Sequence, residues 1–243
     1  MAPAEAAPYS PCMNGRSRHW PAAREAAERF AASNLFAFLL WLRLARGRWL
    51  ADQAAVERWE EEDPDGFADA LWDFAGVIGE RGQALCVAEN VLRRGRARGT
   101  LREEAAAFAA AFRAAGVGPG DAVGGWAPDD PEEAACFLGA NAMGAVWACA
   151  PGAARLRLAR EGTLEFAAAH RGAPVGFVRR PLAAPLAILA GGGIVLQEAF
   201  LAYLRDILLR AEVRPDQRIV PDGEPRWLWG IAALATGASV VLG

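Results

Sequence analysis

The clearest candidate for chemistry is a run of three glycines, Gly191, Gly192 and Gly193, which follows the apolar stretch Leu186–Leu189. A long helix is predicted after the run, over Gly193–Ala211. A glycine turn at the start of a helix presents free backbone N–H groups and the positive end of the helix dipole, which suits a phosphate group. A flexible junction between strand and helix is the other interpretation, because no Lys, Ser or Thr stands near the glycines to hold a metal or a terminal phosphate.

The residues that usually ligate metals or act as nucleophiles show no helpful spacing. The histidines, His19 and His170, lie far apart in the chain. No Cys-x-x-Cys pair occurs among the four cysteines, which are Cys12, Cys86, Cys136 and Cys149. Metal-site spacing and a Gly-x-Ser-x-Gly sequence are both missing. We therefore expect no metal ligand and no catalytic nucleophile, and we interpret the cysteines as buried free thiols of a reducing cytosol.

The elements that must position any site alternate between helix and strand from Thr100 onward. The residues Thr100–Glu103 spell a capping box, which predicts a helix that ends at Gly116. Strands are predicted at 122–126 and 145–149, with a helix at 131–143 between them. Such a β-α-β unit indicates a parallel sheet covered by helices. We expect these two strands to be adjacent and parallel.

The remaining segments predict further helices and two more strands. Residues 1–19 contain Pro, Ser, Gly and Asn without periodicity, which indicates a disordered tail. The other predicted elements are a helix that starts near residue 22 and continues through 35–42, helices at 65–79, 163–170 and 227–235, strands at 186–189 and 239–242.

The composition excludes several classes of partner. The chain has 53% hydrophobic and 23% charged residues, a net charge of −3, and no Lys. This balance disfavours nucleic acid as a partner, since nucleic-acid-binding domains carry basic patches. The apolar stretches at 35–42 and 181–196 are shorter or more interrupted than the ~20 residues that a membrane helix needs. We expect a cytoplasmic protein without a membrane segment.

Several motifs together resemble one family. The residues 116–151 contain Gly-Val-Gly-Pro-Gly-Asp-Ala-Val, Pro-Asp-Asp-Pro-Glu-Glu and Gly-Ala-Asn-Ala-Met-Gly-Ala-Val-Trp-Ala-Cys-Ala-Pro. This order resembles the early βαβ region of acyl-CoA synthetases in the adenylate-forming superfamily. The N-terminal segment resembles the extension of acetoacetyl-CoA synthetases at Trp20-Pro21, 33–39 and 63–74. Weaker matches follow in order at 88–93, 185–189, 192–198, 214–218 and 234–242.

The resemblance implies a fold, a reaction and a set of ligands. The implied fold is an incomplete N-terminal large α/β domain of an adenylate-forming enzyme, with a parallel sheet core and flanking helices. It implies a helical extension at 20–98 and a partial AMP-binding domain at 99–243. The family reaction uses ATP, Mg²⁺ and CoA to convert acetoacetate, through an acyl-adenylate, to acetoacetyl-CoA. Gly191–Gly193 would be the remainder of the phosphate loop, and Trp227 and Trp229 would line the acyl pocket, although aromatic residues that open an apolar helix are also typical of a core.

Departures from the family pattern indicate a shortened and catalytically incompetent chain. The Ser/Thr/Gly-rich loop that ends in Pro-Lys is missing, because Leu189-Ala190 passes directly into Gly191–Gly193. Ala68 and Glu224 stand where the family usually has Trp. The later motifs are absent, and the chain stops at Gly243 directly after a predicted strand. The alternatives are a nonenzymatic binding or assembly module and a nonfunctional remnant of the ligase gene. A shortened sheet should also expose an edge, through which the chain could associate with itself.

Overall fold

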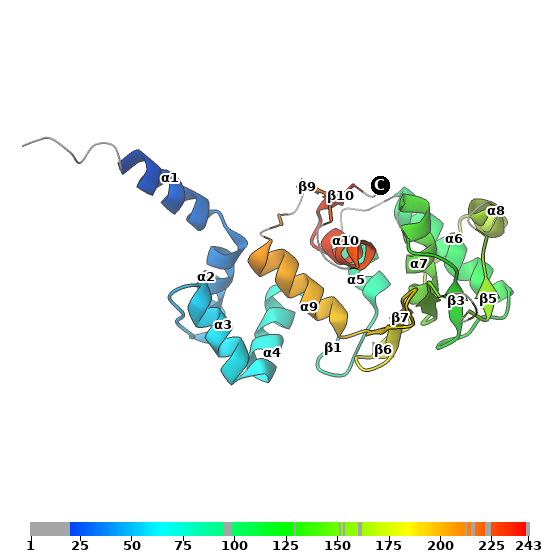
Figure 1. The fold of residues 1–243 in the computed structure, drawn as a ribbon, viewed down its shortest axis with the longest axis horizontal. Coiled ribbons are helices and arrows are strands. Elements are labelled where there is room, and N and C mark those ends of the chain that lie inside the picture. The colour runs from blue at the N-terminus through cyan, green and yellow to red at the C-terminus, as the bar shows by residue number, and fades with distance from the viewer. Residues whose placement is uncertain are drawn as a thin grey trace, which may run out of the picture.

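The computed structural model describes most of the chain from Trp20 onward as alternating helices and strands (Figure 1). The described residues are 20–94, 99–128, 130–150, 152, 154–159, 162–211, 213–214, 217–221 and 225–241. The predicted disordered tail at 1–19 lies outside them. No helix in the described part of the chain is long and apolar enough to cross a membrane.

The N-terminal third is mainly helical. Its elements are α1 (Trp20–Ala31), α2 (Asn34–Arg46), α3 (Gln53–Glu62), α4 (Pro64–Phe74), β1 (Gly79–Glu80), β2 (Ala84–Leu85) and α5 (Val87–Arg94). The middle contains α6 (Thr100–Ala114), β3 (Ala122–Gly124), α7 (Pro131–Ala142), β4 (Val146–Ala148), β5 (Leu156–Arg157) and α8 (Thr163–Ala168). The last part contains β6 (Arg180–Pro181), β7 (Pro185–Ile188), β8 (Ile194–Leu196), α9 (Ala199–Arg205), the π-helical turn η1 (Asp206–Arg210), β9 (Arg218–Ile219), α10 (Arg226–Ala235) and β10 (Ser239–Val240).

A five-stranded sheet forms the centre of the fold, in the order β5-β3-β4-β7-β8. The strands β5, β3, β4 and β7 run parallel to one another, whereas β8 returns antiparallel to β7. β3 and β4 are adjacent, with Val123 opposite Trp147, and α7 connects them. The predicted parallel β-α-β unit is therefore confirmed. The predicted strand at 239–242 is β10, which pairs with β9 in a separate parallel ribbon.

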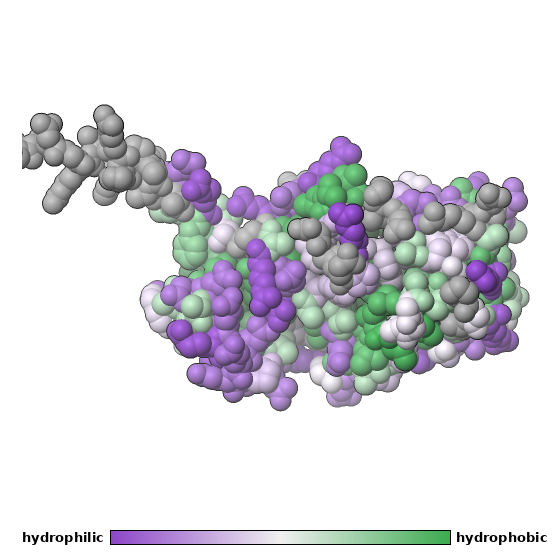
Figure 2. Space-filling view, in the orientation of Figure 1, coloured by the Kyte–Doolittle hydropathy of each residue, from purple (hydrophilic) through white to green (hydrophobic). Residues whose placement is uncertain are grey.

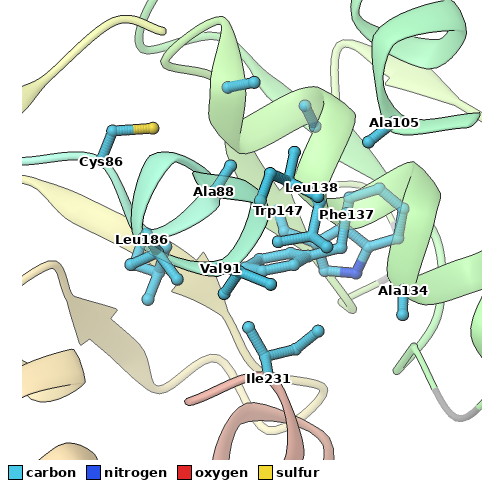
Figure 3. Close-up of a cluster of buried hydrophobic side chains, with 14 of the residues drawn as sticks. Cys86, Ala88, Val91, Ala105, Ala134, Phe137, Leu138, Trp147, Leu186 and Ile231 are labelled. Atoms are coloured by element: carbon cyan, nitrogen blue, oxygen red, sulfur yellow. The ribbon is translucent and has the colours of Figure 1, made fainter. Parts of the chain in front are cut away.

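The main hydrophobic core lies between this sheet and helices α5, α6, α7 and α10. Figure 3 shows Phe137 of α7 and Trp147 of β4 at its centre, with Val91 of α5 and Ile231 of α10 packed around them. The rings of Phe137 and Trp147 meet edge to face, with centroids 6.1 Å apart. Such pairs favour one arrangement beyond simple burial of area. The core therefore joins the neighbouring elements α7 and β4 to α5 and α10, which are distant from them in sequence.

A second hydrophobic cluster holds the N-terminal helices together. Phe38 and Leu42 of α2 are fully buried in it, with Trp59 of α3 and Phe67 of α4. Leu209 of η1 completes this cluster, although it follows in a distant part of the chain. Nearby, Asn34 donates a hydrogen bond to the carbonyl of Val213 at 2.7 Å. Figure 1 shows α1 standing away from this cluster at the left end of the molecule.

The 88–93 motif has a structural role in the fold. The Asn90 side chain accepts from the backbone N–H of Ile78 at 2.8 Å and donates to the Ile78 carbonyl at 2.9 Å. It thereby satisfies both the N–H and the carbonyl group of Ile78, a residue that lies outside the strands. The carboxylate of Glu89 is buried and accepts from Arg179 at 3.0 Å. These contacts fix α5 against the segment that leads into β6.

Two predicted helix boundaries and one predicted cap are wrong for local reasons. The helix expected to run from near residue 22 through 35–42 is two helices, because the Ser33 side chain accepts from Phe36 N–H and starts α2 anew. The helix predicted at 65–79 ends at Phe74, before Gly76 with φ of 57°. The capping box does not form, since Gly99 occupies the N-cap of α6 and makes no side-chain bond. The stop at Gly116 is confirmed, with φ of 77°.

The predicted long helix at 193–211 is the largest error. Ile194, Val195 and Leu196 form strand β8 and pair with β7, and α9 begins only at Ala199. β-branched residues favour extended backbone, and the neighbouring apolar strand β7 offers them a partner. A pattern based on sequence spacing alone does not distinguish this short apolar strand from the first turn of a helix.

Asp63 joins α3 to α4 and gives a testable stability effect. Its carboxylate accepts from Trp59 Nε1 at 3.1 Å and caps α4 by accepting from Gly66 N–H at 3.0 Å. These two hydrogen bonds hold the pKa of Asp63 below its ordinary value of 3.8. A group with a depressed folded-state pKa contributes stability above its unfolded pKa and loses it as pH falls through the folded pKa.

We therefore expect Asp63→Ala to lower the melting temperature by several degrees at pH 7, through loss of the cap. The difference from the wild type should shrink once the pH falls below the ordinary Asp pKa. Thermal melts at a series of pH values measure this. Glu61→Ala, at an exposed position of α3 that caps nothing, is the control. A difference of the same size at every pH would contradict the role assigned to the Asp63 charge.

Candidate functional site

A groove opens where three parallel strands of the sheet reach their carboxyl ends. The residues after β3 contribute Trp126 and Ala127, and Cys149 follows β4. The backbone N–H of Cys149 donates to the carbonyl of Ile188 at 2.8 Å, so the ends of β4 and β7 stay side by side. In open α/β sheets, ligands bind at this carboxyl edge.

Two further segments complete the groove. Leu189, Ala190 and Gly191 extend from β7, and Pro225, Arg226 and Trp227 begin α10. Together the lining residues enclose about 530 Å³, open on one side. The groove therefore combines residues from the sheet edge with the first turn of one helix.

The three glycines lie at the exposed tip of the β7–β8 hairpin. Gly192 has φ of 82°, a left-handed conformation that favours glycine. Its N–H donates to the Leu189 carbonyl at 2.9 Å, and Leu189 N–H donates to the Gly193 carbonyl at 2.8 Å. No helix starts at Gly193, so the helix dipole expected there does not contribute. Gly191 lines the groove, and a phosphate-binding role for the three glycines stays a prediction.

The two candidate tryptophans point in different directions from α10. Trp227 lines the groove, and its ring packs edge-on against Phe137, with centroids 5.1 Å apart. Trp229 is buried elsewhere, where its Nε1 donates to Asp206 at 3.3 Å. Residues two apart on a helix do not share a face. The structure thus brings Trp227 together with Gly191 but leaves Trp229 outside the groove.

Trp126, which the sequence analysis does not single out, is positioned by glycines at the end of β3. Gly124 has φ of 132°, and a Cβ on it would lie 2.9 Å from the Ala148 carbonyl. Trp147 Nε1 donates to the Trp126 carbonyl at 2.8 Å, and the two rings meet edge to face. Trp126 is thereby held over the end of the sheet. A Gly-Gly-Trp sequence directly after a buried strand is the signal that could have predicted it.

The electrostatics of the groove favour an anion at its mouth. Arg226 is exposed, and its Nε donates to the Pro221 carbonyl at 3.2 Å. Among the described residues, no carboxylate forms an ion pair with it. Pro225 is the N-cap of α10 and makes no side-chain bond, so no capping side chain occupies the N-terminus of this helix beside the groove. A cation beside a helix N-terminus suits a carboxylate or a phosphate.

Thiol and metal chemistry are not prominent in this site. Cys86 and Cys136 are free and fully buried, and burial raises the pKa of Cys86 to about 12 and that of Cys136 well above its ordinary value. Both thiols are therefore protonated and inert at neutral pH. Cys149, also buried, is the cysteine that lines the groove. The described residues contain no group of three His, Cys, Asp or Glu side chains that could hold a metal ion.

Comparison with known proteins places this geometry in a class. No protein-family model matches the chain. The structure superposes on an acyl-CoA synthetase of Brucella canis with a TM-score of 0.56, at 16% identity over 72% of this chain and 45% of that one. The fold is that of part of an acyl-CoA synthetase, and the predicted class of incomplete adenylate-forming α/β domain is confirmed.

Within this class, the resemblance is to acetoacetyl-CoA synthetase. The chain superposes on that enzyme from Streptomyces lividans with a TM-score of 0.74, at 21% identity over 89% of this chain and 50% of the other. It is also 30% identical to acetoacetyl-coenzyme A synthetase of Rhizobium meliloti (strain 1021), in an alignment of 168 residues that covers 54% of this chain. The chain spans 25% of the length of that relative. The resemblance predicted from the sequence is therefore confirmed, over part of the enzyme.

Proposed function

We propose that this chain forms part of the substrate groove of an ATP-dependent acyl-CoA ligase that acts on a short β-keto acid. The reaction would convert acetoacetate to acetoacetyl-CoA through an acyl-adenylate. The observation that carries the proposal is the groove at the carboxyl ends of β3, β4 and β7, where Gly191 and Trp227 meet. Its aromatic walls suit a short acyl chain, and Arg226 with the start of α10 suits the carboxylate.

We also propose that the chain by itself does not complete this reaction. ATP with Mg²⁺ needs charged and hydroxyl groups around the triphosphate, and the hairpin tip at Gly191–Gly193 fits it poorly. The tip carries no side chains, and the N–H of Gly192 already serves the turn. The described part of the chain also has no carboxylate cluster for the metal. We therefore propose that this chain binds the acid. We assign to it no step that involves ATP, Mg²⁺ or CoA.

Binding of acetoacetate at Arg226 tests the proposal directly. A hydrogen bond to a charged group contributes roughly 1.5–3 kcal/mol, so Arg226→Gln should weaken acetoacetate binding by about ten- to a hundredfold. Titration calorimetry measures the affinity. Arg218→Gln, an exposed arginine on β9, is the matched control. If Arg226→Gln and Arg218→Gln bound acetoacetate with equal affinity, the groove would not be the binding site for the acid.

A binding or assembly module is the second candidate function. The outer strands of the sheet, β5 and β8, favour it, because each has a neighbour on one side only. Strand edges of this kind pair with other chains. Self-association through such an edge stays a prediction, and light scattering at rising concentration would detect it.

A further inference from the structure

Strand β8 presents part of its backbone away from the sheet. Leu189 N–H donates to the Gly193 carbonyl at 2.8 Å, which identifies Gly193 as a residue that bonds toward β7. Because residues of an antiparallel strand alternate between the two sides, Val195 also faces β7, whereas Ile194 and Leu196 direct their N–H and C=O groups outward. The side chain of Ile194 is 61% exposed. The outer edge of β8 thus offers free hydrogen-bonding groups beside apolar side chains.

This edge lies along a groove separate from the candidate site. β8 and α9 form one wall, and α4 with the Arg81–Gly82 turn forms the other, around about 910 Å³. The consecutive residues Ile194, Val195 and Leu196 all line it. A strand that presented only one face would contribute alternate residues, so β8 presents its edge. Figure 2 shows hydrophobic side chains gathered where β7 lies, and polar ones over α3 and α4.

The lining has an apolar part and a negative part. Trp72, Leu201 and Tyr203 supply aromatic and apolar surface. The charged lining residues are three acids, Asp65, Asp69 and Glu198, against one base, Arg81, which leaves a charge of −2. Arg81 pairs with Asp69 at 2.8 Å and with Asp73. Asp65 and Glu198 are exposed and, among the described residues, form no ion pair.

We propose that this groove binds an extended peptide segment of a partner protein, which adds to the sheet as a strand beside β8. The outward groups of Ile194 and Leu196 select an extended backbone, as in other cases of strand addition. The apolar lining selects alternate apolar side chains, and Asp65 and Glu198 select a basic residue. A second copy of the chain fits less well, because the edge of a folded sheet brings its own helices to a groove that already has α4 as its opposite wall.

Fluorescence anisotropy with a labelled peptide, Arg-Val-Thr-Val-Thr-Val-Arg, tests the backbone part of the proposal. Two derivatives are compared, one N-methylated at every Val and the other at both Thr residues. In strand addition only one of these alternate sets faces β8. We expect one derivative to bind like the parent and the other to bind at least about tenfold more weakly. Equal binding of the two derivatives, or a parent dissociation constant above about 1 mM, would overturn the proposal.

Variants of the whole chain test the protein side. Ile194→Pro removes one outward N–H and leaves the pairing with β7, because proline is tolerated on edge strands. Asp65→Asn/Glu198→Gln removes the acidic groups without touching the strand, and Glu61→Gln/Glu62→Gln on α3 is its matched control. We expect both groove variants to weaken the parent peptide at least about tenfold and the control to leave it unchanged. Unchanged binding in the charge variant would overturn the selection of a basic segment.

The oligomeric state of the chain shows whether a second copy, rather than a partner peptide, occupies the edge of β8. If the wild-type chain forms oligomers by light scattering and Ile194→Pro is a monomer, a second copy occupies the edge and the proposal is wrong. A wild-type monomer that binds the peptide supports it. None of these readouts depends on acetoacetate, so failure here would leave the proposed function of the other groove standing.

Discussion

Pyrophosphate exchange driven by acetoacetate and Mg²⁺ should stay at the level of the buffer control when this chain is the only protein present. Enzymes lower activation barriers by ~8–23 kcal/mol, whereas the N–H groups of the Gly191–Gly193 tip are neutral donors of about 1 kcal/mol each. The nearest arginines on the following helix are already engaged. Arg205 pairs with Glu60, and Arg210 lies 3.8 Å from Asp206. These two arginines are therefore not available to neutralise the triphosphate at this tip.

Exchange is measured with labelled pyrophosphate in the presence of ATP. Activity above the control that disappears in Gly191→Val/Gly192→Val would contradict the prediction and make the glycine tip a functional loop. Gly172→Val is the matched control, because Gly172 has φ of 81° and open space around it, much as Gly192 does. If both variants lost activity equally, general strain at a left-handed residue would be the cause.

Gly139→Val should be among the most destabilising single substitutions in the chain. A Cβ on Gly139 of α7 would lie 2.6 Å from the Phe108 Cβ and 2.7 Å from the Ala105 carbonyl of α6. The backbones of the two helices would have to separate, in a part of the core where Phe108 is fully buried. Overpacking typically costs 1–3 kcal/mol and sometimes more, and backbone atoms cannot move aside as side chains do. We expect a loss of about 3 kcal/mol or more.

Urea denaturation followed by circular dichroism measures this loss. Ala114→Val is the control, because it places the same β-branched side chain at an exposed position of α6. The control should cost only the difference in helix propensity, within about 1 kcal/mol. If Gly139→Val had the same midpoint as Ala114→Val, the close contact between α6 and α7 would not exist in solution.

Local signals in the sequence were sufficient to predict the β-α-β unit. The turn before Ala122, the helix start at Pro131 and the stop at Gly116 depend on residues that are neighbours in sequence. The helix predicted at 193–211 failed because the conformation of Ile194 depends on its pairing with Ile188 across the hairpin. The spacing of apolar residues in the sequence carries no information about such pairing between residues of different strands.

The candidate site was predictable residue by residue but not as a constellation. Gly191 and Trp227 were both singled out, and the packing of α10 against the end of the sheet brings them to one groove. Trp229 was chosen on the same grounds, yet helix geometry directs it to Asp206. Cys149 and Arg226 were not proposed as site residues, and they line the groove because strand β4 ends just before Cys149 and helix α10 begins at Arg226. The proposed division at residues 98 and 99 stays a prediction, although the main core takes residues from both sides of it.

The contribution of Leu209 to the cluster of α2, α3 and α4 has a consequence for synthesis on the ribosome. Phe38, Trp59 and Phe67 are made early, but the residue that completes their packing follows after more than half of the chain. The Asn34 side chain likewise waits for the Val213 carbonyl. Contacts of such long sequence separation form late. During translation, the nascent N-terminal helices should therefore expose an aromatic surface for most of the synthesis time, which makes this segment a substrate for chaperones until η1 has emerged.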